Sequence, residues 1–178
     1  MEDIQIEEQV VLVDENCREL GLMPKLEAHE KGVLHKAVSI IIFNEAGEML
    51  ITQRAFEKYH WPGIWSNACC THPRENESFL AAAERRLQEE LGFETPLKEV
   101  FRFVYKAQDE ITGLVEHEYD TVFIGEYNNA NFEFNRDEIA DVEWVTKSKL
   151  LAEFENEPQK YSFWFKIILK ELVQRNIF

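Results

Sequence analysis

Residues 71–93 read THPRENESFLAAAERRLQEELGF, and this stretch decides which fold we expect. Between residues 77 and 91, apolar side chains recur at three- and four-residue intervals, at Leu80, Ala83, Leu87 and Leu91. This spacing places them on one face of an amphipathic helix. Gly92 follows directly, where a glycine commonly ends a helix in the left-handed conformation. The stretch therefore predicts a helix that buries one face.

Strands surround this helix in the sequence. The runs that predict them are rich in β-branched and apolar residues: 9–13, 37–43, 49–53, 98–107, 114–125 and 142–145. The NEAG segment at 44–47 predicts a hairpin turn between the second and third runs. A short helix is expected after Thr146, and a final helix over 162–175. This order favours an α/β or α+β fold, with a mixed sheet flanked by helices.

The composition limits the class of protein and of partner. The chain has 178 residues, with 19 basic and 34 acidic side chains and a net charge of −15. The length suits one domain, and a 45% hydrophobic content supplies a core. The negative charge argues against nucleic acid or an anionic membrane as a partner. However, residues 1–24 and 126–157 together carry −12 of it, so it says little about a pocket formed by the rest.

Several features predict a soluble, cytoplasmic protein. The three cysteines are an odd number and two are adjacent, which favours free thiols in a reducing compartment. The first residues, MEDI, lack the basic start and apolar stretch of a signal peptide. The longest apolar run, near 37–43, is too short to span a bilayer. The glycines are also too far apart for a GxGxxG or Walker loop.

The predicted helix at 77–91 carries two pairs of opposite charges, and the sequence allows two interpretations of them. Arg86 and Glu90 are four residues apart, as are Arg85 and Glu89, so each pair shares a helix face. Taken alone, they predict surface salt bridges that contribute a few tenths of a kcal/mol each. The alternative is that they belong to a functional site.

A second constellation is Glu116-His117-Glu118, in an extended run. Both glutamates lie on one face of such a strand and His117 lies on the other. The two like charges either face water on an edge strand or share a cation. The chain also contains five histidines, His29, His35, His60, His72 and His117. Imidazoles with two carboxylates would form a mixed N/O site, whose ligand number suits an octahedral ion such as Mn²⁺ or Mg²⁺.

Residues 71–93 resemble a degenerate Nudix box, G-x5-E-x7-R-E-U-x-E-E-x-G-U, in which U is aliphatic. The residues at the spacing of this pattern are Glu77, Arg85, Leu87, Glu89, Glu90 and Gly92. Thr71 replaces the first glycine, Arg86 replaces the glutamate after the arginine, and Phe93 takes the last aliphatic place. The replaced glutamate belongs to the metal cluster of hydrolytic members. Arg86 therefore argues against a hydrolase.

Over about 9–175, the chain resembles the type I isopentenyl-diphosphate isomerases of the Nudix superfamily. The resemblance rests on motifs in family order: Lys25-x3-His29, Leu34-His35, Gln53-Arg54-Ala55 with Lys58, Trp61-Pro-Gly-Ile-Trp65, Asn67-x2-Cys70-x-His72-Pro73, Glu116-x-Glu118 and Tyr161-Ser-Phe-Trp164. It implies a Nudix-type α/β/α sandwich that forms a single domain over 1–178. Its core would span about 35–150, and an N-terminal strand segment and the C-terminal helix would complete the site.

The resemblance also implies an activity and a role for each site residue. The activity is the interconversion of isopentenyl diphosphate and dimethylallyl diphosphate. The catalytic residues would be Cys70, Glu118, Tyr105 and Trp164, where the spacing to His72 selects Cys70 over Cys69. The residues that bind the substrate diphosphate would be Lys25, Arg54, Lys58 and Arg86. The ligands of a first metal ion, Mn²⁺ or Zn²⁺, would be His29, His35, His72, Glu116 and Glu118, and Glu90 would hold a Mg²⁺ ion that bridges to the diphosphate.

The remaining expectations concern partners and alternatives. The substrate would be a small prenyl diphosphate, and the protein a monomer or weak homodimer that binds neither nucleic acid nor membrane. Cys17 and Cys69 are expected to be small buried hydrophobes, and His60 and His117 structural or exposed. The alternative enzyme is a Nudix pyrophosphohydrolase acting on a nucleoside or prenyl diphosphate. The non-catalytic alternative is a metal-stabilised binding domain.

Overall fold

The computed structural model describes residues 8–58, 60–129 and 131–178, so the acidic start of the chain lies outside the described residues. The strands are β1 (Gln9–Val13), β2 (Glu19–Pro24), β3 (His35–Phe43), β4 (Met49–Arg54), β5 (Trp65–Asn67), β6 (Cys69–Thr71), β7 (Lys98–Gln108), β8 (Val115–Glu126) and β9 (Ile139–Val145). The helices are α1 (Lys25–Lys31), α2 (Phe79–Leu91), α3 (Lys147–Asn156), the short 3₁₀ helix η1 (Pro158–Lys160) and α4 (Phe163–Gln174). Every strand and helix expected from the sequence is present, with shifted ends.

β3 is the strand around which the sheet is organised. One of its edges pairs in parallel with β8 along its whole length, from His35 opposite Glu118 to Phe43 opposite Glu126. Its other edge is shared by β1, β6 and β4 in turn. β3 and β4 pair only beside their turn, at Phe43 and Met49, because β6 takes the next part of the edge and β4 continues with β5 and β9. The predicted hairpin is therefore confined to its turn.

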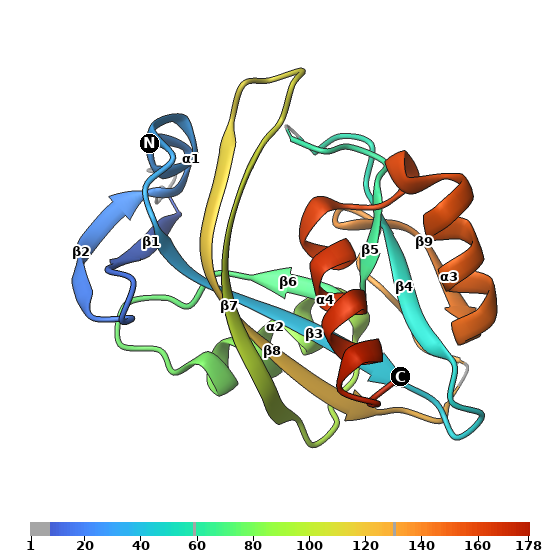
Figure 1. Ribbon diagram of the computed structural model, residues 1–178. Helices are drawn as coiled ribbons and strands as arrows, with labels where there is room; N and C mark the ends of the chain where they lie inside the picture. The colour runs from blue at the N-terminus through green and yellow to red at the C-terminus, as the bar shows by residue number, and fades with distance from the viewer. Residues whose placement is uncertain (1–7, 59, 130) are drawn as a thin grey trace, which may run out of the picture.

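The sheet is covered on both faces, which confirms the predicted α/β/α sandwich. Ile40, Ile41 and Ile42 of β3 are all fully buried, as expected for a strand with both faces covered. Ile40 and Ile42 belong to the core that packs against Leu87 and other residues of α2. Ile41 belongs to the core formed with α3 and α4. Figure 1 shows α4 in front of the sheet and α2 behind it.

The helix predicted over residues 77–91 is α2. It begins two residues after the predicted position, because the Ser78 side chain caps it by accepting a hydrogen bond from the Ala81 N–H at 3.1 Å. It ends as predicted at Gly92, which has a φ of 68°. A Cβ atom at Gly92 would lie 2.5 Å from the Glu133 carbonyl oxygen. Only glycine fits there, so this end of the helix is fixed.

Five short elements were not predicted: β2, α1, β5, β6 and η1. All but η1 lie near the site residues. β2 and α1 form the N-terminal segment beside β1, and β5 and β6 contain three residues each. A seven-residue helix and three-residue strands are too short to display a periodic pattern. Among the described residues, no helix combines the length and apolar character that crossing a membrane requires.

Candidate active site

One pocket collects most of the predicted site residues. It lies between the sheet and its covering segments, with α1, α2, β4 to β8 and α4 contributing to its walls. The predicted residues that line it are Lys25, Arg54, Lys58, Cys70, His72, Arg86, Glu90, Tyr105, Glu116, Glu118 and Trp164. His29 and His35 lie against it and are fully buried.

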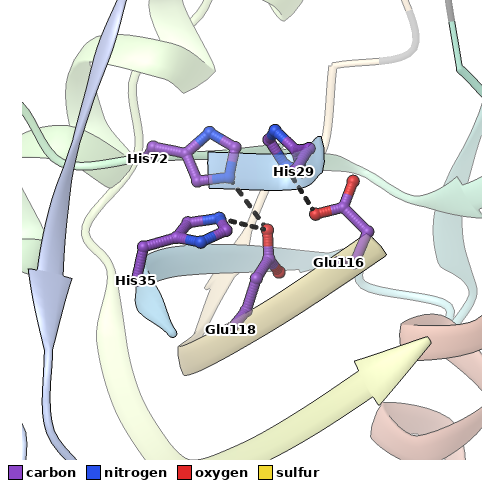
Figure 2. Close-up of side chains that lie close together, drawn as sticks. All are labelled: His29, His35, His72, Glu116 and Glu118. Atoms are coloured by element: carbon purple, nitrogen blue, oxygen red, sulfur yellow. Dashed lines mark hydrogen bonds and ion pairs between the residues drawn. The ribbon is translucent and has the colours of Figure 1, made fainter. Parts of the chain in front are cut away.

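The five residues predicted to hold the first metal ion form one cluster (Figure 2). Each offers one ligand atom, and these atoms all lie within 4.8 Å of one another. His29 Nε2 is 2.9 Å from Glu116 Oε2, and His72 Nε2 is 2.9 Å from Glu118 Oε1. Both glutamates are buried, so the alternative of a solvated edge strand is wrong.

Strand register explains how residues so far apart in sequence meet. Glu116 and Glu118 share the inner face of β8, as period-2 geometry predicts. The parallel pairing places His35, the first residue of β3, opposite Glu118. α1 supplies His29, and His72 directly follows β6. The cluster therefore depends on three strand ends and one short helix.

Hydrogen bonds outside the cluster fix how its ligands point. His29 Nδ1 donates to the Lys25 carbonyl oxygen at 2.7 Å, and His35 Nδ1 donates to the Val33 carbonyl oxygen at 2.8 Å. Since a carbonyl oxygen only accepts, both Nε2 atoms are left to face the carboxylates. The Tyr105 hydroxyl donates to Glu118 Oε2 at 2.6 Å and leaves Oε1 for the histidines. This oriented set of three nitrogens and two oxygens fits a divalent cation.

The pKa shifts of the two glutamates and of His72 agree with that fit. Burial raises the pKa of Glu116, but hydrogen bonds from His29 and His60 hold it well below its ordinary value. Burial and the charge of Glu116 raise the pKa of Glu118, and contacts with His35 and His72 bring it below its ordinary value. Burial lowers the pKa of His72 to about 4. Ionised carboxylates and a neutral imidazole are the forms that bind metal.

Cys70 lies on another wall of the pocket, and β6 places it there. Cys70 is opposite Ser39 of β3, and its Sγ is 3.6 Å from Ser39 Oγ and 3.3 Å from Asn67 Nδ2. Burial raises the pKa of the Cys70 thiol to about 12. The thiol is therefore protonated at neutral pH and has a proton to donate.

A buried acid lies behind this thiol. Ser39 Oγ donates to Asp120 Oδ2 at 2.6 Å. Asp120 is fully buried, and burial followed by the charge of Glu118 raises its pKa well above the ordinary value. Asp120 was not predicted as a site residue. It continues the inward series of Glu116 and Glu118 along β8, and that period-2 spacing was visible in the sequence.

Aromatic rings form the wall beside these groups. Trp164 is 4% exposed, and its ring centroid lies 5.6 Å from that of Trp61 in an edge-to-face arrangement. Tyr105 is 6.4 Å from Trp164 between ring centroids. Trp164 also belongs to the core under α4, so the same ring anchors the helix and faces the pocket.

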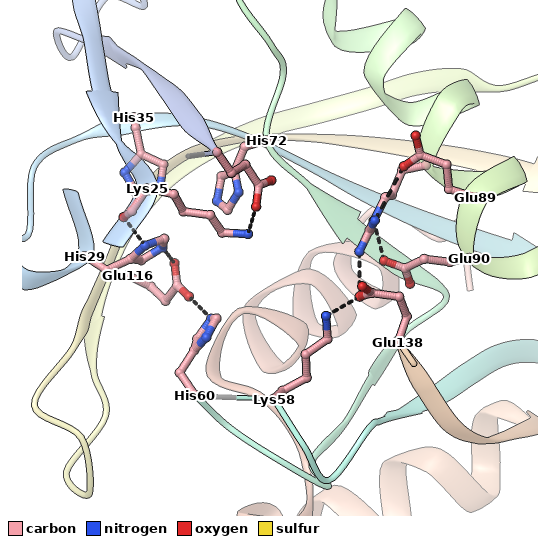
Figure 3. Close-up of polar contacts among 12 residues, drawn as sticks. Lys25, His29, His35, Lys58, His60, His72, Glu89, Glu90, Glu116 and Glu138 are labelled. Atoms are coloured by element: carbon pink, nitrogen blue, oxygen red, sulfur yellow. Dashed lines mark hydrogen bonds and ion pairs between the residues drawn. The ribbon is translucent and has the colours of Figure 1, made fainter. Parts of the chain in front are cut away.

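On the side of the pocket near α2, Arg86 and Lys58 both pair with Glu138. Figure 3 shows Lys58, Glu90 and Glu138 there, away from Lys25. Arg86 Nε is 2.5 Å from Glu90 Oε1, and Arg86 Nη2 is 2.7 Å from Glu138 Oε2. Lys58 also contacts Glu138, at 2.5 Å. Glu90 is buried, and burial raises its pKa. The interpretation of Arg86 and Glu90 as a surface pair is therefore wrong.

The second pair on α2 is closer to what was predicted. Arg85 Nη1 contacts Glu89 at 3.1 Å, and both side chains are partly exposed. Arg85 also binds both oxygens of Glu77, at 2.7 Å and 2.9 Å. The arginine of the Nudix box thus ties α2 to the turn that precedes it.

The cysteines and histidines without an expected role in the site differ in burial and in their contacts. Cys69 is buried as expected, whereas Cys17 is half-buried with a φ of 63° in the turn after β1 and does not belong to the core. The prediction for Cys17 was therefore wrong. His117 faces away from the cluster and its Nδ1 contacts the Gly32 carbonyl oxygen at 2.9 Å, which is a structural contact. His60 is buried, and its Nε2 lies 3.0 Å from Glu116 Oε1.

Comparison with known proteins agrees with this geometry. Residues 33–165 match the NUDIX domain family. The chain is 44% identical over 172 residues to "Isopentenyl-diphosphate Delta-isomerase 2" of Photorhabdus laumondii, covering 97% of this chain and 96% of that one. It is 42% identical to the protein of the same name from Aromatoleum aromaticum, covering 94% and 88%.

Solved structures support the fold. The DR0079 protein from Deinococcus radiodurans superposes with a TM-score of 0.69 at 21% identity, covering 84% of this chain and 90% of that one. The MutT protein from Methanosarcina mazei Go1 gives a TM-score of 0.67 at 19% identity, covering 80% and 95%. The NUDIX domain match and the two sequence relatives show that the chain belongs to the type I isopentenyl-diphosphate Delta-isomerase family of the Nudix superfamily.

Proposed function

We propose that this chain interconverts isopentenyl diphosphate and dimethylallyl diphosphate by adding a proton to one carbon and removing a proton from another. The observation that carries the proposal is that Cys70 and Glu118 line one pocket of a Nudix fold whose usual hydrolytic glutamate is replaced by Arg86. The family relationship supports the same activity.

The reaction explains why these residue types are needed. Protonation of an unactivated alkene gives a tertiary carbocation, and a proton must then leave the other side of the allylic unit. We assign these two transfers to the Cys70 thiol and to Glu118, with the Tyr105 hydroxyl hydrogen-bonded to the glutamate. Because the reaction is reversible, each group donates in one direction and accepts in the other. Such positioned acid–base groups contribute about 10²–10⁴-fold each.

The aromatic wall suits the intermediate. Trp164 offers the face of an electron-rich ring, and cation–π attraction stabilises a desolvated cation by about 2 kcal/mol. Trp61 and Tyr105 pack against Trp164, and we propose that these rings help to keep water from the cation. Water exclusion protects the cation from capture.

The buried His/Glu cluster is suited to a divalent cation, and we propose Mn²⁺ or Zn²⁺ there. When bound, the ion would fix Glu118 and lower its affinity for a proton. We further propose that Glu90 holds Mg²⁺ against the diphosphate. Lys25, Arg54, Lys58 and Arg86 would bind the phosphate oxygens.

We also propose how the protein exists in the cell. It would be a cytoplasmic monomer or weak homodimer, with residues 1–178 forming one domain and a small prenyl diphosphate as its partner. The three cysteines are free, in agreement with a reducing compartment.

An isomerase assay tests the proposed function. The protein, incubated with isopentenyl diphosphate and a divalent cation, should produce a mixture of isopentenyl and dimethylallyl diphosphates. Proton NMR measures the proportion of the two isomers. A phosphate assay on the same samples should stay at background. Release of phosphate without the second isomer would instead identify a Nudix pyrophosphohydrolase.

A further inference from the structure

His60 lies in the loop between β4 and β5, and it reaches the cluster from outside. Its side chain is 7% exposed, and its Nε2 lies 3.0 Å from Glu116 Oε1. The other oxygen of Glu116, Oε2, is 2.9 Å from His29 Nε2. Figure 3 shows Glu116 between the two rings. The carboxylate is thus held at both oxygens by different histidines.

The two contacts differ in what they do. The ligand atoms of His29, His35, His72, Glu116 and Glu118 lie within 4.8 Å of one another, and His60 is outside that set. A carboxylate oxygen accepts and an imidazole N–H donates, so at 3.0 Å the Nε2–H of His60 donates to Glu116 Oε1. Oε1 is then occupied, and Oε2 alone is directed at the cluster.

Glu118 is held in the same way by a different side chain. Its Oε2 accepts from the Tyr105 hydroxyl at 2.6 Å, and its Oε1 faces His72 at 2.9 Å and His35 at 3.7 Å. Each carboxylate of the cluster therefore has one outer oxygen bound to a donor and one inner oxygen facing imidazoles. Such outer partners orient ligands and raise metal affinity.

We propose that His60 is a positioning residue that directs Glu116 toward the divalent cation through a single oxygen. This role of His60 rests on the proposed metal site. Tyr105 has the corresponding role at Glu118, where its hydroxyl binds the outer carboxylate oxygen. His60 also connects the cluster with its own loop. Its ring is 5.6 Å from the Trp61 ring between centroids, and its carbonyl oxygen accepts from Arg54 Nη2 at 3.4 Å.

Metal binding without substrate tests this role. His60→Ala should weaken the binding of Mn²⁺ by about 10–100-fold, measured by calorimetry on metal-free protein. His60→Gln, whose amide can still donate to Oε1, should recover most of that loss. His117→Ala is the matched control, because this histidine neighbours both glutamates in sequence but faces away from the cluster. The affinity of the His117→Ala variant for Mn²⁺ should equal that of the wild type.

A second measurement separates positioning from packing. Co²⁺ absorbs in the visible range according to its coordination, so His60→Ala should change the spectrum of the Co²⁺-loaded protein while the glutamine variant preserves it. Melting of the metal-free variants monitors folding. His60→Ala that binds Mn²⁺ within about twofold of the wild type would overturn the role, since outer partners contribute more than that.

The outcomes also separate this role from the activity. Mn²⁺ binding that depends on His60, in a protein that does not isomerise, would reject the proposed function and keep the positioning role. A protein that isomerises the substrate, but whose Mn²⁺ affinity does not depend on His60, would keep the proposed function and reject the positioning role.

Discussion

His35, the first residue of β3, pairs directly opposite Glu118 of β8, and His35 Nε2 lies 3.7 Å from Glu118 Oε1. Adjacent parallel strands fix this pairing, so the histidine and the carboxylate meet without any flexible segment between them. The hydrogen bond from His35 Nδ1 to the Val33 carbonyl oxygen sets the direction of the ring. The backbone of the sheet itself therefore positions part of the candidate metal site.

Metal binding should follow from this rigid arrangement. Addition of Mn²⁺ should raise the melting temperature, and a chelator should reverse the rise, because a ligand that binds only the folded state stabilises it. Thermal melts with and without the ion measure this effect. The shift should be smaller at about pH 5 than at about pH 7.5. Burial lowers the pKa of His29, but the hydrogen bond and charge of Glu116 raise it above its ordinary value, so protons compete with the metal for this imidazole at about pH 5. A shift that is equal at both pH values would argue against histidine ligands.

Cys70→Ala should abolish most of the activity. The thiol is proposed to transfer a proton, so kcat should fall by about 10²–10⁴-fold with little change in melting temperature. Cys69→Ala is a close control, because its buried thiol packs in the core on the α2 side. A Cys70→Ala enzyme with near wild-type kcat would remove the cysteine from the mechanism.

Glu138→Gln should strengthen the binding of inorganic diphosphate. Glu138 pairs with both Lys58 and Arg86, so it competes with an anion for two cations that line the pocket. Removal of its charge should tighten binding about fivefold, corresponding to about 1 kcal/mol for partly exposed pairs. Calorimetric titration measures this change. Glu143→Gln, which removes a pair with Lys149, should leave the affinity unchanged.

Glu77→Gln should destabilise the fold in a pH-dependent way. Hydrogen bonds from Arg85, with a backbone hydrogen bond from Arg74, lower the pKa of Glu77 despite its partial burial. Its stabilisation is therefore present above the unfolded pKa of about 4.3 and is lost as the pH falls through the folded value. At neutral pH we expect a loss of about 1 kcal/mol in the free energy of unfolding, measured with urea. If the wild type and the Glu77→Gln variant still differ in free energy of unfolding at about pH 2, the ion pair is not the cause of the difference.

The sequence predicted the longer elements and the family motifs well, for identifiable reasons. α2 has a full amphipathic period and a glycine end, and β3 has an unbroken apolar run. The Glu116 and Glu118 spacing required a shared face, although only the structure shows that this face is buried. By contrast, α1 is too short to show a period, so no sequence pattern predicted the position of His29 in a helix.

The parts that could not be predicted depend on contacts between distant segments. Nothing local marks His60 as a partner of Glu116, since 56 residues and several strands separate them. Similarly, Arg86 and Glu90 have the spacing of an ordinary surface pair. In the structure, Arg86 and Glu90 are covered by the walls of the pocket and by Glu138, which lies in the loop before β9.

Proton transfer at carbon distinguishes the proposed isomerisation from hydrolysis, and exchange in D₂O detects this transfer. With Mn²⁺ and Mg²⁺ present, isopentenyl diphosphate incubated with the protein in D₂O should give dimethylallyl diphosphate that carries deuterium, detected by NMR and mass spectrometry. The Cys70→Ala variant should incorporate little or none in the same time. Wild-type protein saturated with both metal ions that leaves both isomers free of deuterium would contradict the proposed isomerisation.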